Sequence, residues 1–192
     1  ARRCGHGASG RNGGWLMGSL EGLHRFALPD GKLPEPVINE LRSLIANIYR
    51  TTEQHGIECD FAHGGALFAA ARYPAQRPRA VQHLRALHRL GFTDDDYSWL
   101  SPNATARQIN VANVEGAVFT PHVATLHPLK LVHGLVMACE RLGVQLYENT
   151  HVTTVNGRLE TPEGLTITAQ HRVIATEGYS NQSPLNKRIL SV

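Results

Sequence analysis

Residues Gly5 to Gly18 read GHGASGRNGGWLMG, a stretch in which six of fourteen positions are glycine. Because glycine has no side chain, the backbone here can approach a phosphate group or a flat aromatic ring closely. Ser9, Arg11 and Asn12 lie between the glycines and can donate hydrogen bonds, and a guanidinium group suits phosphate. A flexible turn near a chain end has a similar composition. The stretch therefore predicts either a ligand-binding loop or an ordinary turn.

The glycine-rich stretch completes neither of two well-known motifs. The dinucleotide fingerprint G-x-G-x-x-G fits at Gly5, Gly7 and Gly10, but no strand is expected ahead of it. The nucleophile-elbow pattern G-x-S-x-G fails at its last position, which is Arg11. These mismatches exclude a standard dinucleotide loop and a serine hydrolase.

The composition of the 192 residues, 42% hydrophobic and 18% charged, predicts a folded globular chain. The net charge is only +3 and the basic residues are scattered, so we expect no nucleic-acid partner. Apolar stretches are too short to span a bilayer and no signal peptide opens the chain, so we expect no membrane partner. Cys4, Cys59 and Cys139 lack metal or redox spacing, which favours a reducing, cytoplasmic location.

Periodic apolar residues predict the helices. The spacing of Val37, Leu41, Leu44, Ile45 and Ile48 indicates a helix that ends before Gly56, and two more helices are expected over about Ala75–Leu90 and over Pro128–Leu142. A shorter helix is expected to begin at Pro102, with Ser101 as its N-cap.

Short apolar runs bounded by turn residues predict the strands. A hairpin is expected around Asn156-Gly157, the signature of a type I′ turn, and another strand after Pro162. The ends of the chain have the pattern of α/β layers and the middle that of an α+β insertion, so the predicted class is mixed α/β. The other expected strands are Ile57–Phe61, Gly65–Ala71, the stretch after Val114, Val144–Tyr147 and Val173–Ala175.

Four stretches resemble one known family, in the same order. GHGASGRNGGWL closely resembles the segment after the second strand of the dinucleotide-binding domain in D-amino-acid-oxidase-like FAD-dependent oxidoreductases, above all the gamma-glutamylputrescine oxidoreductase and glycine oxidase types. GIECDFAHGGALFAA (56–70) resembles the first strands of that family's substrate domain. Residues 126–155 resemble the helix and strands that return to the FAD domain, and VIATEGYSNQ (173–182) resembles a turn near the cofactor. The resemblance covers most of the chain.

This resemblance implies part of an FAD-binding Rossmann-like domain with an inserted α+β substrate domain. The implied layout is an FAD-domain segment over 1–56, a substrate-domain portion over 57–125, and a return to the FAD domain over 126–192. Nothing like the family's N-terminal βαβ unit precedes Ala1, so we expect an internal fragment that binds FAD weakly or not at all. Exposed edges of such a fragment would favour self-association.

The resemblance also implies a function and a set of site residues. The family's chemistry is FAD-dependent oxidation of the C–N bond of a small-molecule amine or amino acid to an imine, and no catalytic residue can be assigned here. Glu177 stands where the family commonly has asparagine. The implied cofactor-binding residues are Ser9, Arg11, Asn12, Gly13 and Gly14 at the flavin and pyrophosphate, Trp15 and Leu16 at the flavin edge, the Val152 backbone at the adenine, and Ala175 and Thr176 near the phosphate and ribose.

Other interpretations stay open beside this one. The chain could be a non-catalytic truncated module that binds no flavin and acts only through protein contacts. A domain of a bifunctional RNA-modifying enzyme is disfavoured by the lack of basic patches.

Two groups of residues invite a metal interpretation. The spacing of His122, His127 and His133 matches no zinc motif, and His127 is expected at a helix entry, with a substrate-side role as the alternative. The run Asp94–Asp96 predicts a solvated acidic turn rather than a cation site.

Overall fold

The computed structural model describes residues 2–155, 158–173 and 175–176. The chain divides into two compact units, one spanning Cys4–Leu146 and the other combining Ala1–Arg3 with Tyr147–Val192. The second unit contains β7 (Thr153–Val155), β8 (Arg158–Glu160) and β9 (Thr166–Ile167). The first contains, in chain order, the 3₁₀ turn η1 (Ala8–Gly10), β1 (Trp15–Met17), the 3₁₀ turn η2 (Leu23–Phe26), α1 (Glu35–Gln54), β2 (Ala62–His63), β3 (Ala66–Ala70), α2 (Gln76–Arg89), β4 (Ser98–Leu100), α3 (Pro102–Ala106), β5 (Gly116–Thr120), β6 (Val123–Thr125) and α4 (Pro128–Arg141).

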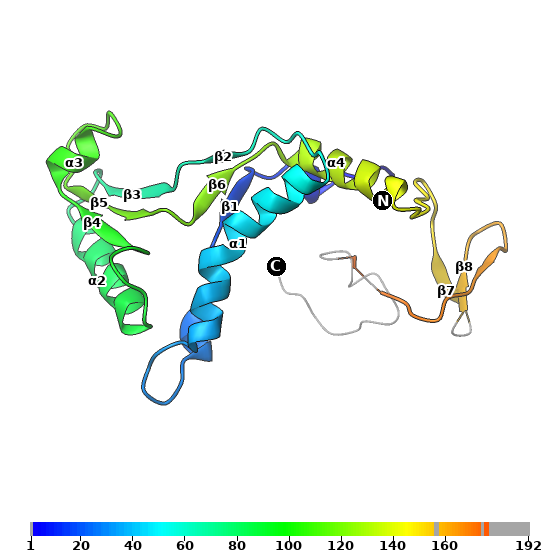
Figure 1. The fold of residues 1–192 in the computed structure, drawn as a ribbon, viewed down its shortest axis with the longest axis horizontal. Helices are drawn as coiled ribbons and strands as arrows, with labels where there is room; N and C mark the ends of the chain where they lie inside the picture. Colours follow the sequence, from blue (N-terminus) through cyan, green and yellow to red (C-terminus); the bar gives the residue numbers. More distant parts are fainter. Residues whose placement is uncertain (1, 156–157, 174, 177–192) are drawn as a thin grey trace. The chain divides into compact units, whose positions relative to one another are not determined.

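Two antiparallel sheets form the framework of the first unit, in the orders β1-β6-β2 and β3-β5-β4. Because β2 runs into β3 and β5 into β6, one long bent hairpin contributes to both sheets (Figure 1). At the bend, Gly65 N–H donates to the Val123 carbonyl at 2.9 Å, and the strand β5–β6 is interrupted at Pro121-His122. The stretch after Val114 is therefore two strands rather than one.

The predicted helices are all present. Helix α1 begins two residues before Val37 and ends at Gln54, before Gly56 as predicted. Its buried face centres on Ile38, Ile45 and Thr52, whereas Leu44 of the expected stripe is exposed. Helix α3 begins at Pro102, and the Ser101 hydroxyl accepts from Ala104 N–H as predicted. One buried cluster joins α1, α2, β5 and their loops: Leu23, Leu33, Ile38, Leu84, Leu87, Phe92, Tyr97 and Val118.

Helix α4 packs through its smallest residues. A Cβ added at Gly134 would overlap the Ile57 side chain, so the helix approaches that segment closely. Ala138 is buried, while Leu135 and Leu142 of the expected apolar stripe are 43% and 72% exposed. Ile57, Cys59, Leu126 and Ala138 form the second buried cluster.

Two expected strands are wrong, and the third is not found at its described residues. Ile57–Phe61 forms no strand, because Asp60 has φ +53°, which is outside the range of extended backbone. The backbone hydrogen bonds of this segment run from Ile57 N–H to the Thr52 carbonyl and from His127 N–H to the Cys59 carbonyl, and the strand begins only at Ala62. Residues Val144–Tyr147 form no strand. Val173 is 89% exposed and Ala175 is also exposed outside any strand, while Ile174 lies outside the described residues. An apolar run predicts burial, but a strand also needs an adjacent backbone segment with which it can form a series of hydrogen bonds.

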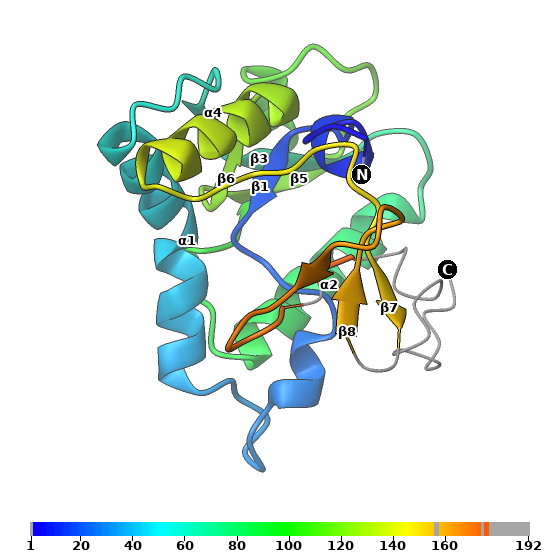
Figure 2. The same ribbon diagram turned by 90° about the vertical axis from the view of Figure 1, so that its right-hand side faces the viewer.

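The predicted hairpin is confirmed in the second unit. β7 pairs with β8 in the register Val155↔Arg158, which leaves two residues for the turn, and β9 adds to β8 (Figure 2). The Asn156-Gly157 turn itself lies outside the described residues. Every described strand pair is antiparallel. The mixed α/β class is confirmed, and the layout of domains stays a prediction.

In the part of the chain that the structure describes, no helix has both the length and the apolar character needed to cross a membrane.

Candidate functional site

The glycine-rich loop ends in a backbone contact that only glycine permits. Gly14 has φ +68°, its carbonyl accepts from Leu126 N–H at 2.9 Å, and it is buried. A Cβ at this position would overlap the Leu126 carbonyl oxygen. Directly after it, β1 pairs with β6, with Trp15 opposite Thr125. The loop is therefore anchored to the strand that leads into α4.

The start of the loop closes on itself. Gly10 lies so close to the Gly5 carbonyl that an added Cβ would overlap that oxygen. Between them, Gly10 N–H donates to Gly7 at 3.2 Å and Arg11 N–H to Ala8 at 3.1 Å, which forms η1. Close packing thus explains glycine at Gly10 and Gly14 independently of any ligand.

Asn12 holds the middle of the loop in shape. Its amide Nδ2 donates to the carbonyls of Ala8 at 3.2 Å and Ser9 at 3.1 Å. Its Oδ1 accepts from Gly14 N–H at 2.8 Å, which is the pattern of an Asx turn. Since both ends of this amide are used within the loop, Asn12 shapes the loop, and a contact from its side chain to a cofactor stays a prediction.

The rest of the loop presents polar groups at the surface. Ser9, Arg11 and Gly13 are exposed, and the Trp15 side chain is 68% exposed. An added Cβ at Gly13 would meet only the Trp15 ring, so the backbone there is open on its outer side. Open glycine backbone beside an arginine is the composition that a phosphate or a flavin requires. On this observation the loop fits the implied cofactor.

The remaining predicted cofactor residues belong to the second unit. Val152 immediately precedes β7 and is 41% exposed. Ala175 and Thr176 are exposed and lie outside any strand. The structure therefore has Ser9 to Gly14 in one loop, with exposed Trp15 and half-buried Leu16 directly after it in β1, and it assigns Val152, Ala175 and Thr176 to a different unit.

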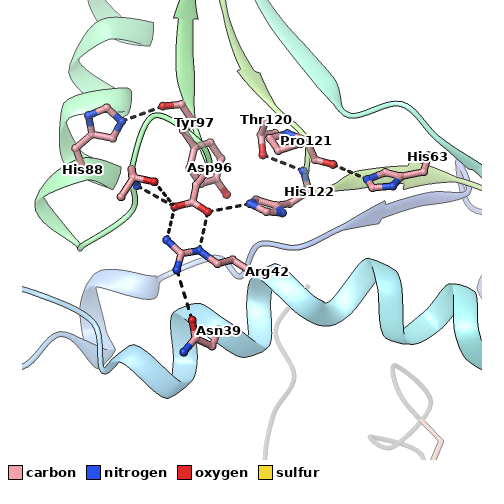
Figure 3. A network of polar contacts seen from close by, with 10 residues as sticks. Asn39, Arg42, His63, His88, Asp96, Tyr97, Thr120, Pro121 and His122 are labelled. Atoms are coloured by element: carbon pink, nitrogen blue, oxygen red, sulfur yellow. Dashed lines mark hydrogen bonds and ion pairs between the residues drawn. The ribbon is translucent and has the colours of Figure 1, made fainter.

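A buried carboxylate, Asp96, connects several segments of the first unit near β5 and β6 (Figure 3). Asp96 is 2% exposed, and Arg42 of α1 donates to it twice, from Nε at 2.8 Å and from a terminal nitrogen at 2.7 Å. Thr93 donates its N–H at 2.9 Å and its hydroxyl at 3.2 Å to the same group. The prediction of a solvated turn over Asp94–Asp96 is thus wrong for Asp96, whose charge is neutralised by a partner that the local sequence does not reveal.

His122 completes this cluster at the bend between β5 and β6. Its Nε2 lies 2.9 Å from Asp96 Oδ1, and its ring is 19% exposed. The hydrogen bond from Arg42 holds the pKa of Asp96 well below its usual range, against the opposing effect of burial. Burial, and then the charge of Asp96, raise the pKa of the neighbouring Tyr97.

The histidines that suggested a metal serve separate purposes. His122 pairs with Asp96, and His127 caps α4, because its Nδ1 accepts from Lys130 N–H at 3.3 Å. The prediction that His127 marks a helix entry is confirmed. His133 is exposed on α4. Among the described residues, no three His, Cys, Asp or Glu side chains gather as metal ligands would.

Comparison with known proteins places the chain beside flavin enzymes. The model of a family described as FAD dependent oxidoreductase matches residues 1–191. Probable oxidoreductase OrdL of Haemophilus influenzae is 26% identical over 202 residues, covering 99% of this chain and 46% of that protein. Gamma-glutamylputrescine oxidoreductase of Escherichia coli is 27% identical over 188 residues, which cover 93% of this chain and 42% of that protein.

A solved structure has a similar fold. The crystal structure of glycine oxidase from Geobacillus kaustophilus superimposes with a TM-score of 0.70 at 20% identity, over 92% of this chain and 47% of that one. The chain spans less than half the length of each of these three proteins.

Proposed function

The chain belongs to the FAD-dependent oxidoreductase family, and from that premise we propose that the whole protein oxidises the C–N bond of an amine or amino acid to an imine. The names of two similar proteins, gamma-glutamylputrescine oxidoreductase and glycine oxidase, support an amino compound as the substrate class. The family uses FAD, so FAD is the proposed cofactor.

FAD, when bound, would accept a hydride equivalent from the C–H next to the amine nitrogen, and oxygen or an electron carrier would take the electrons onward. The imine would then hydrolyse to a carbonyl compound. What this chain contributes is binding and orientation of the cofactor, since none of its residues is assigned as an acid or a base.

The open face of the glycine loop is the observation that carries the proposal. Exposed Arg11 is suited to a pyrophosphate oxygen, and the backbone at Gly13 is open to a flat ring. Asn12 holds that backbone in place through its hydrogen bonds to Ala8, Ser9 and Gly14. In this proposal Ser9, Arg11, Asn12, Gly13 and Gly14 line the flavin and pyrophosphate, Trp15 and Leu16 lie at the flavin edge, Val152 meets the adenine, and Ala175 and Thr176 lie near the phosphate and ribose.

The proposed layout assigns residues 1–56 and 126–192 to the FAD domain and residues 57–125 to the substrate domain. The resemblance of the four sequence stretches supports these bounds, and the similarity to the glycine oxidase fold supports the family architecture.

Retention of flavin by the purified chain tests the proposal. The chain is incubated with FAD and desalted, and its visible absorption spectrum is recorded. In a chain as long as the relatives we expect retained flavin bands that Arg11→Ala weakens and that Arg107→Ala, a change at an exposed arginine after α3, leaves unaltered. For the 192 residues alone we expect weak retention or none. Equal loss in both variants would contradict the role of the loop.

The alternative is a module that binds no flavin. A colourless chain at FAD concentrations far above micromolar would favour that alternative for these 192 residues. The oxidase activity would then be tested on a chain as long as the relatives, by following imine-derived carbonyl product from a panel of amines.

A further inference from the structure

A shallow groove of about 540 Å³ lies along the exposed side of α2, and all of its described lining residues belong to that helix. Another face of the helix is buried, since Leu84 and Leu87 pack in the cluster that contains Val118 of β5 (Figure 1). We call this surface the arginine groove, and its residues are Arg77, Pro78, Val81, Gln82, Arg85 and Arg89.

Helical spacing brings three arginines of the groove into one row. Arg85 follows Arg77 by eight positions and Arg89 follows Arg85 by four, with Val81 between the first two. At a rise of about 1.5 Å per residue, the row is about 18 Å long and its last two members are about 6 Å apart along the axis. The basic residues are scattered in the sequence, and the folded helix gathers these three on one surface.

The positive charge of α2 is not balanced on the helix itself. The helix has four arginines, the three of the row and Arg79, and no Asp or Glu, so its formal charge is +4 against +3 for the whole chain. Arg77 lies in the first turn, where the helix dipole disfavours a cation, and Arg85 repels Arg89 one turn away. An anion bound over the row would offset both of these unfavourable terms.

The three guanidinium groups of the row form no hydrogen bond or ion pair within the part of the chain that the structure describes. Other arginines of the first unit differ in this respect, since Arg42 donates to Asp96 and Arg141 to the His55 carbonyl. The donors of the row are therefore available to a ligand. A planar guanidinium group matches the geometry of phosphate oxygens and can donate two hydrogen bonds to them.

The lining of the groove favours a small linear anion over a macromolecule. Among its described residues, Pro78 and half-buried Val81 are the only apolar ones. A protein interface needs large apolar or aromatic anchors, and so does a helix that lies on a membrane. Single-stranded nucleic acids need aromatic side chains for stacking, and the described lining contains none.

We propose that the arginine groove binds a linear oligophosphate, the chemical group that inorganic tripolyphosphate and the triphosphate of a nucleotide share. Phosphate groups would lie over Arg85 and Arg89, and the chain would extend past Val81 toward Arg77. The inference goes beyond the proposed function, because the site lies on α2 rather than in the glycine loop and neither flavin nor amine takes part. Its test is made on the chain without FAD.

Valine methyl groups report on the two places where such an anion could bind. Val81 lies in the arginine groove, whereas Val132 of α4 lies beside the glycine loop, with its Cγ1 3.5 Å from the position of a Cβ added at Gly5. The chain is labelled with ¹³C at the valine methyl groups, and Val81→Ile and Val132→Ile assign the two signals. It is titrated with tripolyphosphate at low salt, where screening is weak. We expect a saturable shift of the Val81 signal and no matching shift of Val132.

Two variants with the same change of charge locate the site on the helix. Arg85→Gln removes the middle guanidinium group of the row and should weaken tripolyphosphate binding at least about fivefold. Arg79→Gln, at an exposed position of α2 outside the groove, should weaken it less than about twofold. Both positions are exposed and glutamine is a good helix former, so neither change threatens the fold.

Matched ligands identify the chemical group and its source. Orthophosphate should bind at least about fivefold more weakly than tripolyphosphate, because it contacts one part of the row only. Acetylated and amidated tetraglutamate should also bind at least about fivefold more weakly, because ordering its flexible carboxylates costs conformational entropy. ATP, added without magnesium, distinguishes the sources: tighter binding than tripolyphosphate would indicate a nucleotide, and equal or weaker binding an inorganic chain.

Four results would each overturn the proposal. A Val81 signal that stays still, or a Val132 signal that alone moves, would mean that the anion does not bind in the arginine groove. Equal losses in Arg85→Gln and Arg79→Gln would mean a general attraction to the helix without a site. Orthophosphate as tight as tripolyphosphate would remove the role of the row, and tetraglutamate as tight would mean a docking surface for an acidic protein segment.

Discussion

The glycine loop and the Asp96 cluster hold their parts of the first unit in opposite ways. In the loop, side chains are absent where backbones touch, as at Gly14 against the Leu126 carbonyl. In the cluster, charged side chains from distant segments converge on one buried carboxylate. Close packing of neighbouring backbone holds the loop in place, whereas direct hydrogen bonds and ion pairs between residues far apart in the sequence hold the cluster.

That difference explains why the glycine loop could be noticed in the sequence and the Asp96 cluster could not. Glycine spacing is a local signal, readable within fourteen residues. Arg42 and His122 lie 54 and 26 positions from Asp96, so no window around the acidic run contains them.

The largest effect is expected at Asp96. Asp96→Ala leaves the Thr93 N–H and the Arg42 guanidinium without their carboxylate. Removal of one partner of a buried ion pair costs about 3–5 kcal/mol, and we expect the lower end of that range because the Arg42 side chain is 37% exposed. Urea denaturation of this variant measures the loss. Asp95→Ala, at an exposed neighbouring position, is the matched control and should change the free energy of unfolding by less than about 0.5 kcal/mol. Similar losses in both variants would mean that the buried pair has no special role.

The next effect is expected at Gly14. Gly14→Ala forces a side chain into positive φ and against the Leu126 carbonyl, so we expect a loss of about 2–3 kcal/mol in the free energy of unfolding. Gly7→Ala is the control, because Gly7 has φ −89° and open space around its missing Cβ. If the two alanines were equally tolerated, the tight closure of the loop would be disproved.

The decrease in the free energy of unfolding at low pH should depend on the Asp96 cluster rather than on the glycine loop. The pKa of Asp96 is lowered in the folded chain, so its stabilisation is complete above the unfolded pKa of about 3.9 and is lost as the pH falls through the folded value. We expect the free energy of unfolding to fall by about 2 kcal/mol below pH 4. The Asp96→Asn variant should be less stable at neutral pH, and its free energy of unfolding should fall less steeply as the pH is lowered. If the two proteins lost stability in parallel from pH 5 to pH 2, Asp96 would not be the cause of the acid dependence.

Much of the fold could be predicted because its signals are local. The Ser101 cap, the entry of α4 at His127 and the β7–β8 hairpin each depend on a few adjacent residues, and each is confirmed. The strands expected at Ile57–Phe61 and Val144–Tyr147 failed because a ladder depends on what lies alongside, which an apolar run does not specify.

The candidate site shows the same contrast between features encoded locally and features that depend on distant segments. The roles of the loop residues were implied by the resemblance of a local stretch to one family and stay predictions, and the structure gives that loop an open outer face. The Asp96 cluster escaped prediction because its members come from separated segments: Arg42 on α1, Thr93 after α2, and His122 between β5 and β6. Such a site has no sequence signature until the chain is folded.

The smallest effect is expected at a second ion pair with the same N–O distance, which is a control for the role of burial in the Asp96 cluster. Lys130 Nζ lies 2.7 Å from Asp60 Oδ1, as close as Arg42 lies to Asp96, but its two side chains are 51% and 59% exposed. The hydrogen bond from Lys130 lowers the pKa of Asp60, yet solvent screens the pair. We expect Lys130→Met to leave the urea midpoint nearly unchanged at moderate salt, and any small loss to vanish as salt rises. A loss as large as that of Asp96→Ala, persisting in high salt, would show that pair length rather than burial decides the stability of this unit.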